Sequence, residues 1–405
     1  MQQILRPLDE RELAHVLSES ARLRRTLDVQ GLGSKRRYGR PVETAALLTM
    51  RNFRGLTMYE PAEMVVSVRA GTPVGVLEAE LAKHNQQLAF EPIDPGPALG
   101  EATGQHTIGG VIATNLSGAR RVASGAARDH VLGIRGINGR GELFKGGGRV
   151  MKNVTGYDLC RMLAGSWGTL AVLTELTLKT APRAEETRTL LLFGQPDEIG
   201  VEVLCAAMGT PYEVTGAIHL QAGFAGRLRS SAGRQGSAIT ALRIENFSPS
   251  IAYRAGKLRQ IFSPYGAMEE LAHKESLIFW DELRQLSFLQ KSTEPVWRIS
   301  TSPKMGPRVV QAISGYMECR AAYDWSGGLV FIEVPASADA GAADIRRVIA
   351  TRGGHATLMR AEVSVRSVVE VFQPLEAGVR RLSDGIKRMF DPMNILNPGR
   401  LYADA

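Results

Sequence analysis

Glycine is concentrated in one stretch of this 405-residue chain, and that stretch limits how the chain can fold. Sixteen of the 43 glycines fall within residues 100–168, where few helical periods can be found. Glycine is needed where the backbone turns with positive φ, or where it approaches another group too closely for a side chain. We therefore expect a series of tight turns that bring the backbone close to a ligand.

The length and composition of the chain set the outer limits of its class. A chain of 405 residues exceeds what one hydrophobic core usually serves, so we expect two domains, or one domain with a cap. No segment approaches 18 consecutive apolar residues, and the N-terminus lacks the apolar region of a secretory signal. The three cysteines (Cys160, Cys205 and Cys319) are far apart, which predicts reduced thiols and a cytoplasmic location.

The formal net charge of +8 leaves several partners open. A basic protein can bind nucleic acid or an acidic membrane surface, but it can equally bind an anionic cofactor and substrate. The basic clusters are short and lack the interleaved aromatic residues that stack on bases. We therefore expect no nucleic-acid binding.

Periodicity and cap residues predict mixed helix and strand in the first half of the chain. Asp9 and Glu12 stand at the N-cap and N3 positions of a helix whose apolar face includes Leu13 and Leu17. Thr72 and Pro73 open a second helix. Strands are expected at 26–30, 63–71 and 169–180.

From residue 188 onward, strands and helices alternate, which predicts an α/β sandwich with an antiparallel sheet and helices on one face. Strands are expected at 188–194, 217–222, 238–246, 296–300, 328–335 and 355–361. Helices are expected at 196–208, 250–262, 275–289, 305–317, 339–352 and 374–390. The polar, glycine-rich segment 226–237 is expected to be a mobile loop.

The first chemically informative motif follows the strand at 26–30. It consists of Gly31, Leu32, Gly33, Ser34 and Lys35. The N–H groups of such a turn can converge on an anion, and the hydroxyl and the ammonium group add to this, so a diphosphate is a suitable ligand. A plain strand-to-helix turn is the alternative. The spacing is not that of the G-x-G-x-x-G fingerprint, and the motif lacks the G-K-[ST] of a P-loop.

Three further glycine-containing motifs follow, at 107–118, 124–133 and 156–170. Short hydroxyl, amide and glycine residues let the main chain approach a planar ring and its phosphate tail. Each motif alone could be structural. Their common order and spacing make a shared binding role the better interpretation.

These motifs carry a resemblance to a known family. The order GLGS, TIGGVIATN, SGAARDHVLG, GYDLxxxxxGSWGTL and ILNPGRL resembles the FAD-binding fold of the vanillyl-alcohol oxidase / p-cresol methylhydroxylase superfamily. Within it, the chain is most similar to the FAD-binding E subunits of bacterial glycolate oxidase (glycolate dehydrogenase). The resemblance is dense over 27–182, thinner through the second half, where WRIS and GGHATLMR match, and strong again at the tail.

The resemblance implies an α+β fold in three parts. Residues 1–182 would form a PCMH-type FAD-binding domain of two α/β subdomains. Residues 183–365 would form an α/β sandwich, a ferredoxin-like cap with an antiparallel sheet on the substrate side. Residues 366–405 would form a C-terminal helix and tail that return to the flavin.

The resemblance also implies which residues hold the cofactor. The turn at Gly31–Lys35 would hold the FAD pyrophosphate, and the tail at Asn397 and Arg400 would close on the flavin. The isoalloxazine and ribityl chain would be lined by Thr107, Ile108, Gly109, Gly110, Val111, Asn115, Ser117 and Gly118. The adenine side would be flanked by Val131, Val172, Leu173 and Thr174.

Two departures from the family pattern are informative. Relatives that bind the flavin covalently often use a histidine just after the glycine turn, where this chain has Ser34 or Lys35. We therefore predict noncovalent FAD. Relatives commonly have GSEGTL where this chain has Trp167, for which we expect core packing, with contact to the cofactor as the alternative.

The implied activity is oxidation of glycolate, a 2-hydroxy acid, to glyoxylate, with electrons passed to an acceptor other than NAD. Such a reaction needs a base and a cationic clamp for the carboxylate besides the flavin. Arg298 is the candidate clamp and His355 the candidate base; a surface arginine and a structural histidine are the alternatives. No metal site is expected, because the GDGNxH-like signature of related 2-hydroxyacid dehydrogenases is missing at 353–357.

The implied partners are a homologous flavoprotein D subunit and an iron–sulfur F subunit, through which the cytoplasmic chain would reach the inner membrane. The dispersed cysteines could not hold an iron–sulfur cluster. Two alternatives stay open. The chain could be a noncatalytic flavin-binding relay or assembly subunit, or a stand-alone FAD-dependent 2-hydroxyacid dehydrogenase or oxidase.

Overall fold

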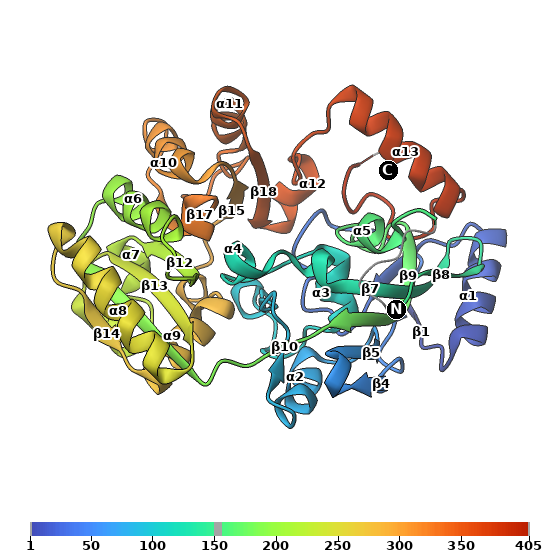
Figure 1. The fold of residues 1–405 in the computed structure, drawn as a ribbon. Helices are drawn as coiled ribbons and strands as arrows, with labels where there is room; N and C mark the ends of the chain where they lie inside the picture. The colour runs from blue at the N-terminus through green and yellow to red at the C-terminus, as the bar shows by residue number, and fades with distance from the viewer. Residues whose placement is uncertain (1, 150–155, 404–405) are drawn as a thin grey trace.

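The computed structural model describes residues 2–149 and 156–403. Figure 1 shows two lobes side by side, one built on an eight-stranded sheet and the other on smaller sheets that carry both ends of the chain. The α+β class expected from the sequence is confirmed. Within the described residues, no helix is both long enough and apolar enough to cross a membrane.

The chain begins with a three-stranded parallel sheet in the order β1-β3-β2. Its elements are β1 (Gln3–Leu5), α1 (Glu10–Arg22), β2 (Leu27–Gln30) and β3 (Ala46–Thr49). Helix α1 starts as expected, because the Asp9 carboxylate accepts a hydrogen bond from the Glu12 N–H at 2.9 Å. Its apolar face buries Leu13 and Leu17 against the sheet. This packing fixes the direction in which β2 delivers the chain to the first glycine turn.

A five-stranded antiparallel sheet in the order β4-β5-β9-β7-β8 forms the rest of this lobe. Its strands are β4 (Leu56–Glu60), β5 (Val65–Arg69), β7 (Val131–Asn138), β8 (Leu143–Gly147) and β9 (Ala171–Lys179). The helices are α2 (Val74–Ala82), α3 (Ile108–Thr114), α4 (Arg121–Ser124) and α5 (Leu159–Leu163), and a short ribbon joins β6 (Gln86–Gln87) to β10 (Ala181–Pro182). Helices α2, α3 and α5 pack on the apolar side chains of the sheet, so α3 is held between the sheet and the turn after β2.

The second lobe is built on an eight-stranded antiparallel sheet with the order β14-β11-β13-β12-β16-β17-β15-β18. Its strands are β11 (Glu186–Phe193), β12 (Val214–Leu220), β13 (Ile239–Asn246), β14 (Glu269–Leu271), β15 (Val296–Ser300), β16 (Arg320–Asp324), β17 (Leu329–Glu333) and β18 (His355–Arg360). Its helices are α6 (Asp197–Met208), α7 (Ala222–Ala225), α8 (Ser248–Phe262), α9 (His273–Arg284), α10 (Gly306–Ser314) and α11 (Ala342–Arg352).

This sheet contains two copies of one ferredoxin-like unit. The first runs β11-α6-β12-β13-α8-β14 and the second runs β15-α10-β16-β17-α11-β18, and in each the first strand lies between the third and the fourth. The two units join edge to edge where β12 pairs with β16. The expected ferredoxin-like cap is therefore present twice.

The two faces of the eight-stranded sheet have different coverings. Helices α6, α8, α10 and α11 pack on one face, as the sequence predicted, but α9 does not. The other face packs on α7, on α9 and on residues of the first lobe, including Tyr38 and Leu116. A buried ion pair joins the lobes, because the Arg243 guanidinium holds the Glu91 carboxylate at 2.7 and 3.0 Å.

Several elements differ from the sequence expectation for local reasons. Helix α9 ends at Arg284 rather than near 289, because Leu286 adopts a left-handed conformation (φ +51°). Helix α11 begins at Ala342 rather than 339, because the Asp339 carboxylate accepts from the N–H groups of Gly341 and Ala343. The segment expected to be a mobile loop contains a short 3-10 helix with Ala232 buried.

The chain ends with α12 (Val363–Val368), α13 (Ala377–Phe390) and a tail that returns to the first lobe. Leu27 in β2 donates to the Ile395 carbonyl at 2.7 Å, and its own carbonyl accepts from the Asn397 N–H at 3.0 Å. The tail thus lies parallel to β2. The domain boundaries expected at 182/183 and 365/366 stay predictions; the first lies between β10 and β11.

Candidate functional site

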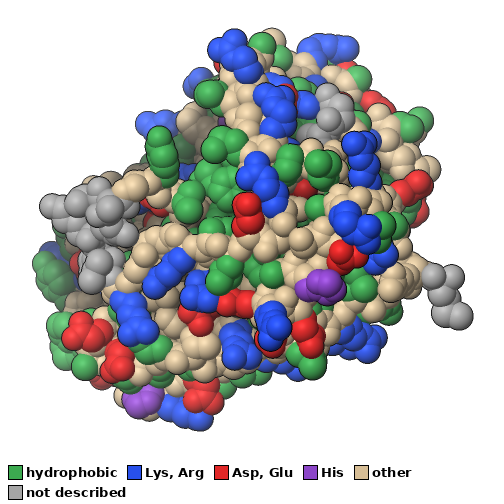
Figure 2. All heavy atoms as spheres, turned by 90° about the vertical axis from the view of Figure 1, so that its right-hand side faces the viewer, with side chains coloured by type: hydrophobic (Ala, Val, Ile, Leu, Met, Phe, Trp, Pro, Cys, Tyr) green, Lys and Arg blue, Asp and Glu red, His purple; other side chains and the backbone are tan. Residues whose placement is uncertain are grey.

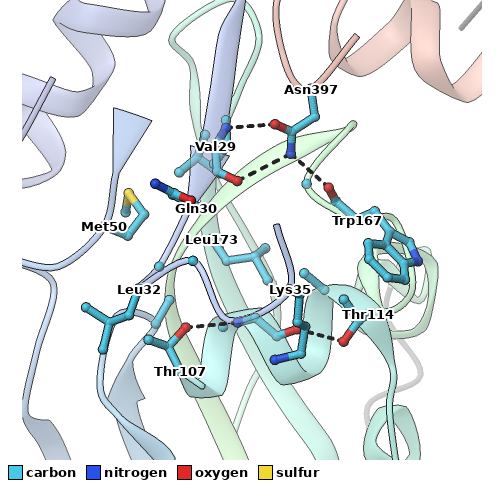
Figure 3. A pocket seen from close by; sticks show the side chains of 18 of the residues that line it. Val29, Gln30, Leu32, Lys35, Met50, Thr107, Thr114, Trp167, Leu173 and Asn397 are labelled. Carbon is cyan, nitrogen blue, oxygen red and sulfur yellow. Dashed lines mark hydrogen bonds between the residues drawn. The ribbon is translucent and has the colours of Figure 1, made fainter. Parts of the chain in front are cut away.

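A pocket opens where β2, the turn after it, the start of α3, the segment before β9 and the C-terminal tail meet (Figure 3). It contains about 800 Å³ of space not filled by protein atoms, part of it open to solvent. The lining residues are Asp28, Val29, Gln30, Gly31, Leu32, Gly33, Ser34, Lys35, Arg36, Met50, Ala70, Thr107, Gly109, Gly110, Ala113, Thr114, Trp167, Gly168, Ala171, Val172, Leu173, Asn397 and Arg400.

The turn after β2 depends on its glycines. Gly33 has φ +88°, a conformation that side chains with a Cβ rarely adopt. A Cβ on Gly31 would lie 2.3 Å from the Thr107 hydroxyl oxygen, so only glycine lets this turn approach the start of α3. The Thr107 side chain in turn caps α3, accepting from the Gly110 N–H at 3.3 Å. The two glycine motifs therefore form one continuous wall of the pocket.

Lys35 places a buried cation beside this wall. Burial lowers the pKa of its ammonium group to about 8, and the Asp94 carboxylate only partly opposes this. The ammonium lies 3.5 Å from the Ser34 hydroxyl, with no carboxylate in hydrogen-bonding contact among the described residues. A buried ammonium group is costly unless an anion compensates it. The pocket therefore favours an anionic ligand at this end.

Gln30 adds a second unsatisfied group. Its side-chain oxygen is buried and has no hydrogen-bond partner within the described part of the chain, although it lies beside the glycine turn. Buried polar atoms are normally paired, so an orphan in a pocket wall indicates a ligand that donates to it. Glycine backbone, an ammonium cation and a free amide fit a group with both phosphates and ring N–H or hydroxyl donors, as FAD has.

The C-terminal tail closes the pocket through two side chains. Asn397 accepts from the Val29 N–H at 2.7 Å and donates to the Trp167 carbonyl at 2.9 Å (Figure 3). Arg400 donates to the Lys35 carbonyl at 2.7 Å and also reaches the carbonyls of Arg36 and Arg40. Burial lowers the pKa of Arg400 to about 10. The tail therefore fixes both β2 and the turn that follows it.

Trp167 lies at the edge of the pocket rather than only in a core. Its backbone has φ +55°. Its ring packs edge-on against the rings of Tyr38 and Phe372, with distances between ring centres of 4.9 and 5.2 Å. A Cβ on the following Gly168 would come within 2.9 Å of the Asn397 amide nitrogen. Trp167 thus packs on one residue of the first lobe and one of the C-terminal segment while also lining the pocket.

The structure brings twelve of the residues expected from the sequence together in this pocket. They are Gly31, Leu32, Gly33, Ser34, Lys35, Thr107, Gly109, Gly110, Val172, Leu173, Asn397 and Arg400. Ile108 and Val111 are core residues of α3. Thr174 points to α1, where its hydroxyl donates to Glu10, and Val131 does not line the pocket.

Three other expected residues lie beyond the end of α3 and shape the chain there. The Asn115 side chain accepts from the Arg128 N–H at 3.1 Å, and the Ser117 hydroxyl accepts from the Ala127 N–H at 2.9 Å. Ser117 and Gly118 line a separate, smaller cavity between the lobes, together with Asp324. The expected contact of these three residues with the flavin therefore stays a prediction.

Sequence reasoning missed several lining residues. Asp28, Gln30 and Arg36 adjoin the glycine motif, so extending the motif by a few positions would have found them. Met50 and Ala70 come from the ends of other strands and carry no local signal. Only the way the strands pair brings them to the pocket.

The candidate clamp Arg298 lies on β15, on the face that packs against the first lobe. Its guanidinium lies 5.2 Å from the Trp325 ring centre, and that of Arg121 lies 4.3 Å from the same ring. The Arg298 Nε is buried without a hydrogen-bond partner in the described residues. Burial, together with the charge of Arg298, lowers the pKa of Arg121. Two guanidinium groups near one aromatic ring could together hold an anion between the lobes.

The candidate base His355 does not lie in the pocket. It is exposed at the start of β18, where its backbone pairs with Ser300. In the pairing of β15 with β18, the residue opposite Arg298 is Thr357 and not His355. Among the described residues, no group of three or more His, Cys, Asp or Glu side chains could hold a metal ion.

Comparison with known proteins agrees with this geometry. A family model described as an FAD binding domain matches residues 1–147. Over 387 residues, the chain is 34% identical to the glycolate oxidase subunit GlcE of Escherichia coli (strain K12), a match that covers 93% of each protein. It is also 30% identical over 189 residues to the glycolate oxidase subunit GlcD of Bacillus subtilis (strain 168), covering 46% of this chain and 38% of that protein.

The fold itself is found in solved structures. The chain superposes on p-cresol methylhydroxylase, solved with substrate bound, with a TM-score of 0.70 at 12% sequence identity. That match covers 99% of this chain and 88% of the other. At such low identity the likeness concerns the fold alone, and it confirms the PCMH-type architecture expected from the glycine motifs.

Proposed function

The chain belongs to the GlcE family of glycolate oxidase subunits, which are FAD-dependent oxidoreductases, and on that premise we propose that it oxidises glycolate to glyoxylate as one subunit of a complex. The observation that supports this most is the glycine-lined pocket with its buried, uncompensated Lys35 cation. FAD supplies the two-electron acceptor for such an oxidation when it is bound.

The chain's own residues would hold the cofactor from three sides. The backbone of the turn at 31–35 and the Lys35 ammonium bind the pyrophosphate, since converging N–H groups and a desolvated cation both favour negative charge. Gln30 would satisfy its buried oxygen with a ligand donor. Asn397 and Arg400 hold the turn in the shape that binds, without contributing chemistry of their own.

We propose that the FAD is bound noncovalently. Ser34 and Lys35, where covalent relatives have histidine, are buried and neither is the usual attachment residue. Cys160 is outside the pocket lining, and burial raises the pKa of its thiol to about 11, which makes it a poor nucleophile. Acid precipitation should therefore release a yellow supernatant, and colour that stays with the pellet would contradict noncovalent binding.

Arg298 and Arg121 would bind the carboxylate of the 2-hydroxy acid. Both guanidinium groups face the Trp325 ring in the space between the lobes, and a carboxylate would relieve the repulsion between them. His355 stays the proposed base. Its side chain is exposed, whereas the Arg298 guanidinium lies between the lobes, so the geometry favours the role of Arg298 more than that of His355.

The proposed partners are a homologous flavoprotein D subunit and an iron–sulfur F subunit, and the proposed location is the cytoplasm, with the complex at the inner membrane. A relative of this chain is named GlcD, another subunit of the same oxidase. The electrons must leave this chain, and the described residues contain no cluster of metal ligands to carry them onward. We therefore place the acceptor in a partner chain.

A second function has one observation in its favour. The only histidine in the glycine-flanked turn at 353–357 is exposed and lacks an adjacent acid, so the partner could carry out the oxidation while this chain relays electrons. Anaerobic mixing of the purified chain with glycolate in a stopped-flow instrument separates the two readings. Bleaching of the flavin without partners supports catalysis here; a flavin that bleaches only with the D subunit present supports the relay. A stand-alone oxidase would instead form peroxide in air.

A further inference from the structure

Helix α13 contains a seven-residue sequence repeat. Its two halves, AGVRRLS and DGIKRMF, align position by position over residues 377–390. Val379, Leu382, Ile386 and Met389 are spaced alternately by three and four residues along α13. This 3-4 spacing is the seam by which one helix packs along another. We call these four residues the α13 seam.

The α13 seam faces solvent instead of the protein. Val379 is 50% exposed, Leu382 67% and Met389 66%, and Ile386 is half-buried. The charged side of the helix packs inward instead: Lys387 donates to the Thr169 and Leu396 carbonyls at 2.8 and 3.3 Å. A surface helix normally turns its apolar stripe toward the core. The reversed orientation leaves the seam without a partner inside the described chain.

Two glycines mark the same surface. Gly378 and Gly385 are one heptad apart beside the seam, and a Cβ on either would meet nothing within 4 Å. Glycine weakens a helix relative to alanine, and no contact within this chain requires it at these positions. Glycine next to a packing seam lets a second helix approach closely, so both positions suit an external helix.

Charge indicates what kind of helix would fit. Arg381 and Arg388, also one heptad apart, are exposed on the outer side of α13. Figure 2 looks onto this side of the molecule and shows hydrophobic side chains gathered in its upper part among Lys and Arg side chains. Basic side chains flanking a seam favour acidic side chains on the partner helix.

We propose that the α13 seam binds an α-helix of a partner subunit of the oxidase, a helix with its own apolar heptads edged by Asp or Glu. This rests on the proposed function of the chain as a subunit. A lipid surface fits less well, because a heptad spacing and two glycines beside it match the shape of a partner helix. In addition, Lys387 points inward and is not available to lipid headgroups. Lys387 touches the carbonyls next to Gly168 and Asn397 in the pocket lining, so the partner would lie about one helix diameter, ~10–12 Å, from the pocket wall.

The test uses the full chain co-expressed with the D and F subunits of its host. The double variant Leu382→Glu/Met389→Glu should reduce the partner recovered with the chain by at least about thirtyfold, since central apolar contacts dominate such interfaces. Gly385→Leu, which should strengthen the isolated helix, should reduce recovery as well. Ile278→Glu on α9, at a position 57% exposed, is the matched control and should leave recovery unchanged.

The outcomes separate the seam from the proposed function. Undiminished partner recovery with both α13 variants, or an equal loss with Ile278→Glu, would overturn the proposal. So would a wild-type dimer in gel filtration that Leu382→Glu/Met389→Glu dissociates, or binding to anionic phospholipid vesicles that this variant abolishes. A wild-type chain that holds FAD but recovers neither subunit contradicts the complex itself, and with it the seam.

Discussion

The side chain of Asn397 accepts a hydrogen bond from the backbone N–H of Val29 at 2.7 Å, across a sequence separation of 368 residues. The same side chain donates to the Trp167 carbonyl. One residue of the tail therefore ties together the strand that enters the glycine turn and the segment that forms the opposite wall of the pocket. The pocket depends on segments that are far apart in the sequence.

Replacing Asn397 with alanine should weaken FAD binding and lower the melting temperature. The change removes the hydrogen-bond partner of the half-buried Val29 N–H and Trp167 carbonyl, at a cost of about 1 kcal/mol for each bond. Thermal unfolding with and without added FAD measures both effects. Asn246→Ala, on β13 in the other lobe, is the control and should leave the FAD-induced stabilisation intact.

Because the Lys35 ammonium group is buried, we expect FAD binding to depend on pH. Burial lowers the pKa of the Lys35 ammonium in the apoprotein to about 8, below its usual value near 10.5. The unfolded chain therefore binds more protons between these values, so the stability of the apoprotein should rise as the pH increases from 8 toward 10. FAD affinity should fall over the same range, because the charged form binds the pyrophosphate.

Titration of FAD into the apoprotein at several pH values measures this effect. Lys35→Met should weaken binding about 10- to 100-fold at pH 7, by removing a charge-assisted contact, and should abolish the pH slope above 8. Lys83→Met, at an exposed lysine, is the control. A slope that persists in Lys35→Met would assign the titration to another group.

Gly33→Val should abolish FAD binding without unfolding the second lobe. The Gly33 φ of +88° is strained for any residue with a Cβ, and the added methyl groups would occupy space that the phosphates need. Gly256→Val, in helix α8 with nothing within 4 Å of an added Cβ, is the matched control and should bind FAD normally. The flavin absorbance per mole of purified protein gives the result.

Arg298→Met should impair reduction by substrate while leaving FAD content unchanged. If Arg298 and Arg121 bind the carboxylate, the variant should raise the glycolate concentration needed for half-maximal flavin reduction about 30-fold or more. Arg298→Lys should recover part of this, because it keeps the charge but not the fork of donors. Arg308→Met, at an exposed position, should behave like the wild type. Equal kinetics in Arg298→Met and the wild type would remove this residue from the substrate site.

The sequence predicted local structure well wherever the signal lies in neighbouring residues. The turn at Gly31–Lys35 depends on glycine, and the Asp9 cap of α1 depends on a side chain that satisfies a nearby N–H, so both could be recognised directly. The contribution of Asn397 and Arg400 came only from resemblance to a family, because nothing near them in the sequence indicates a contact with β2.

Other features depend on long-range packing and could not be predicted. Met50 and Ala70 reach the pocket through strand pairing, and Ser117 turns instead to the Ala127 N–H. The two ferredoxin-like units are joined into one sheet by the pairing of β12 with β16 at His219 and Leu220. Alternation of strands and helices indicated the class of this lobe but not the order of its strands.

Equilibrium titration of FAD into the apoprotein, followed by flavin fluorescence, tests the central claim most directly. We predict that the wild type and Gly256→Val bind one FAD per chain, that Lys35→Met binds more weakly, and that Gly33→Val does not bind. FAD binding of equal strength by Gly33→Val, Lys35→Met and the wild type would show that the cofactor lies elsewhere and would contradict the assignment of this pocket.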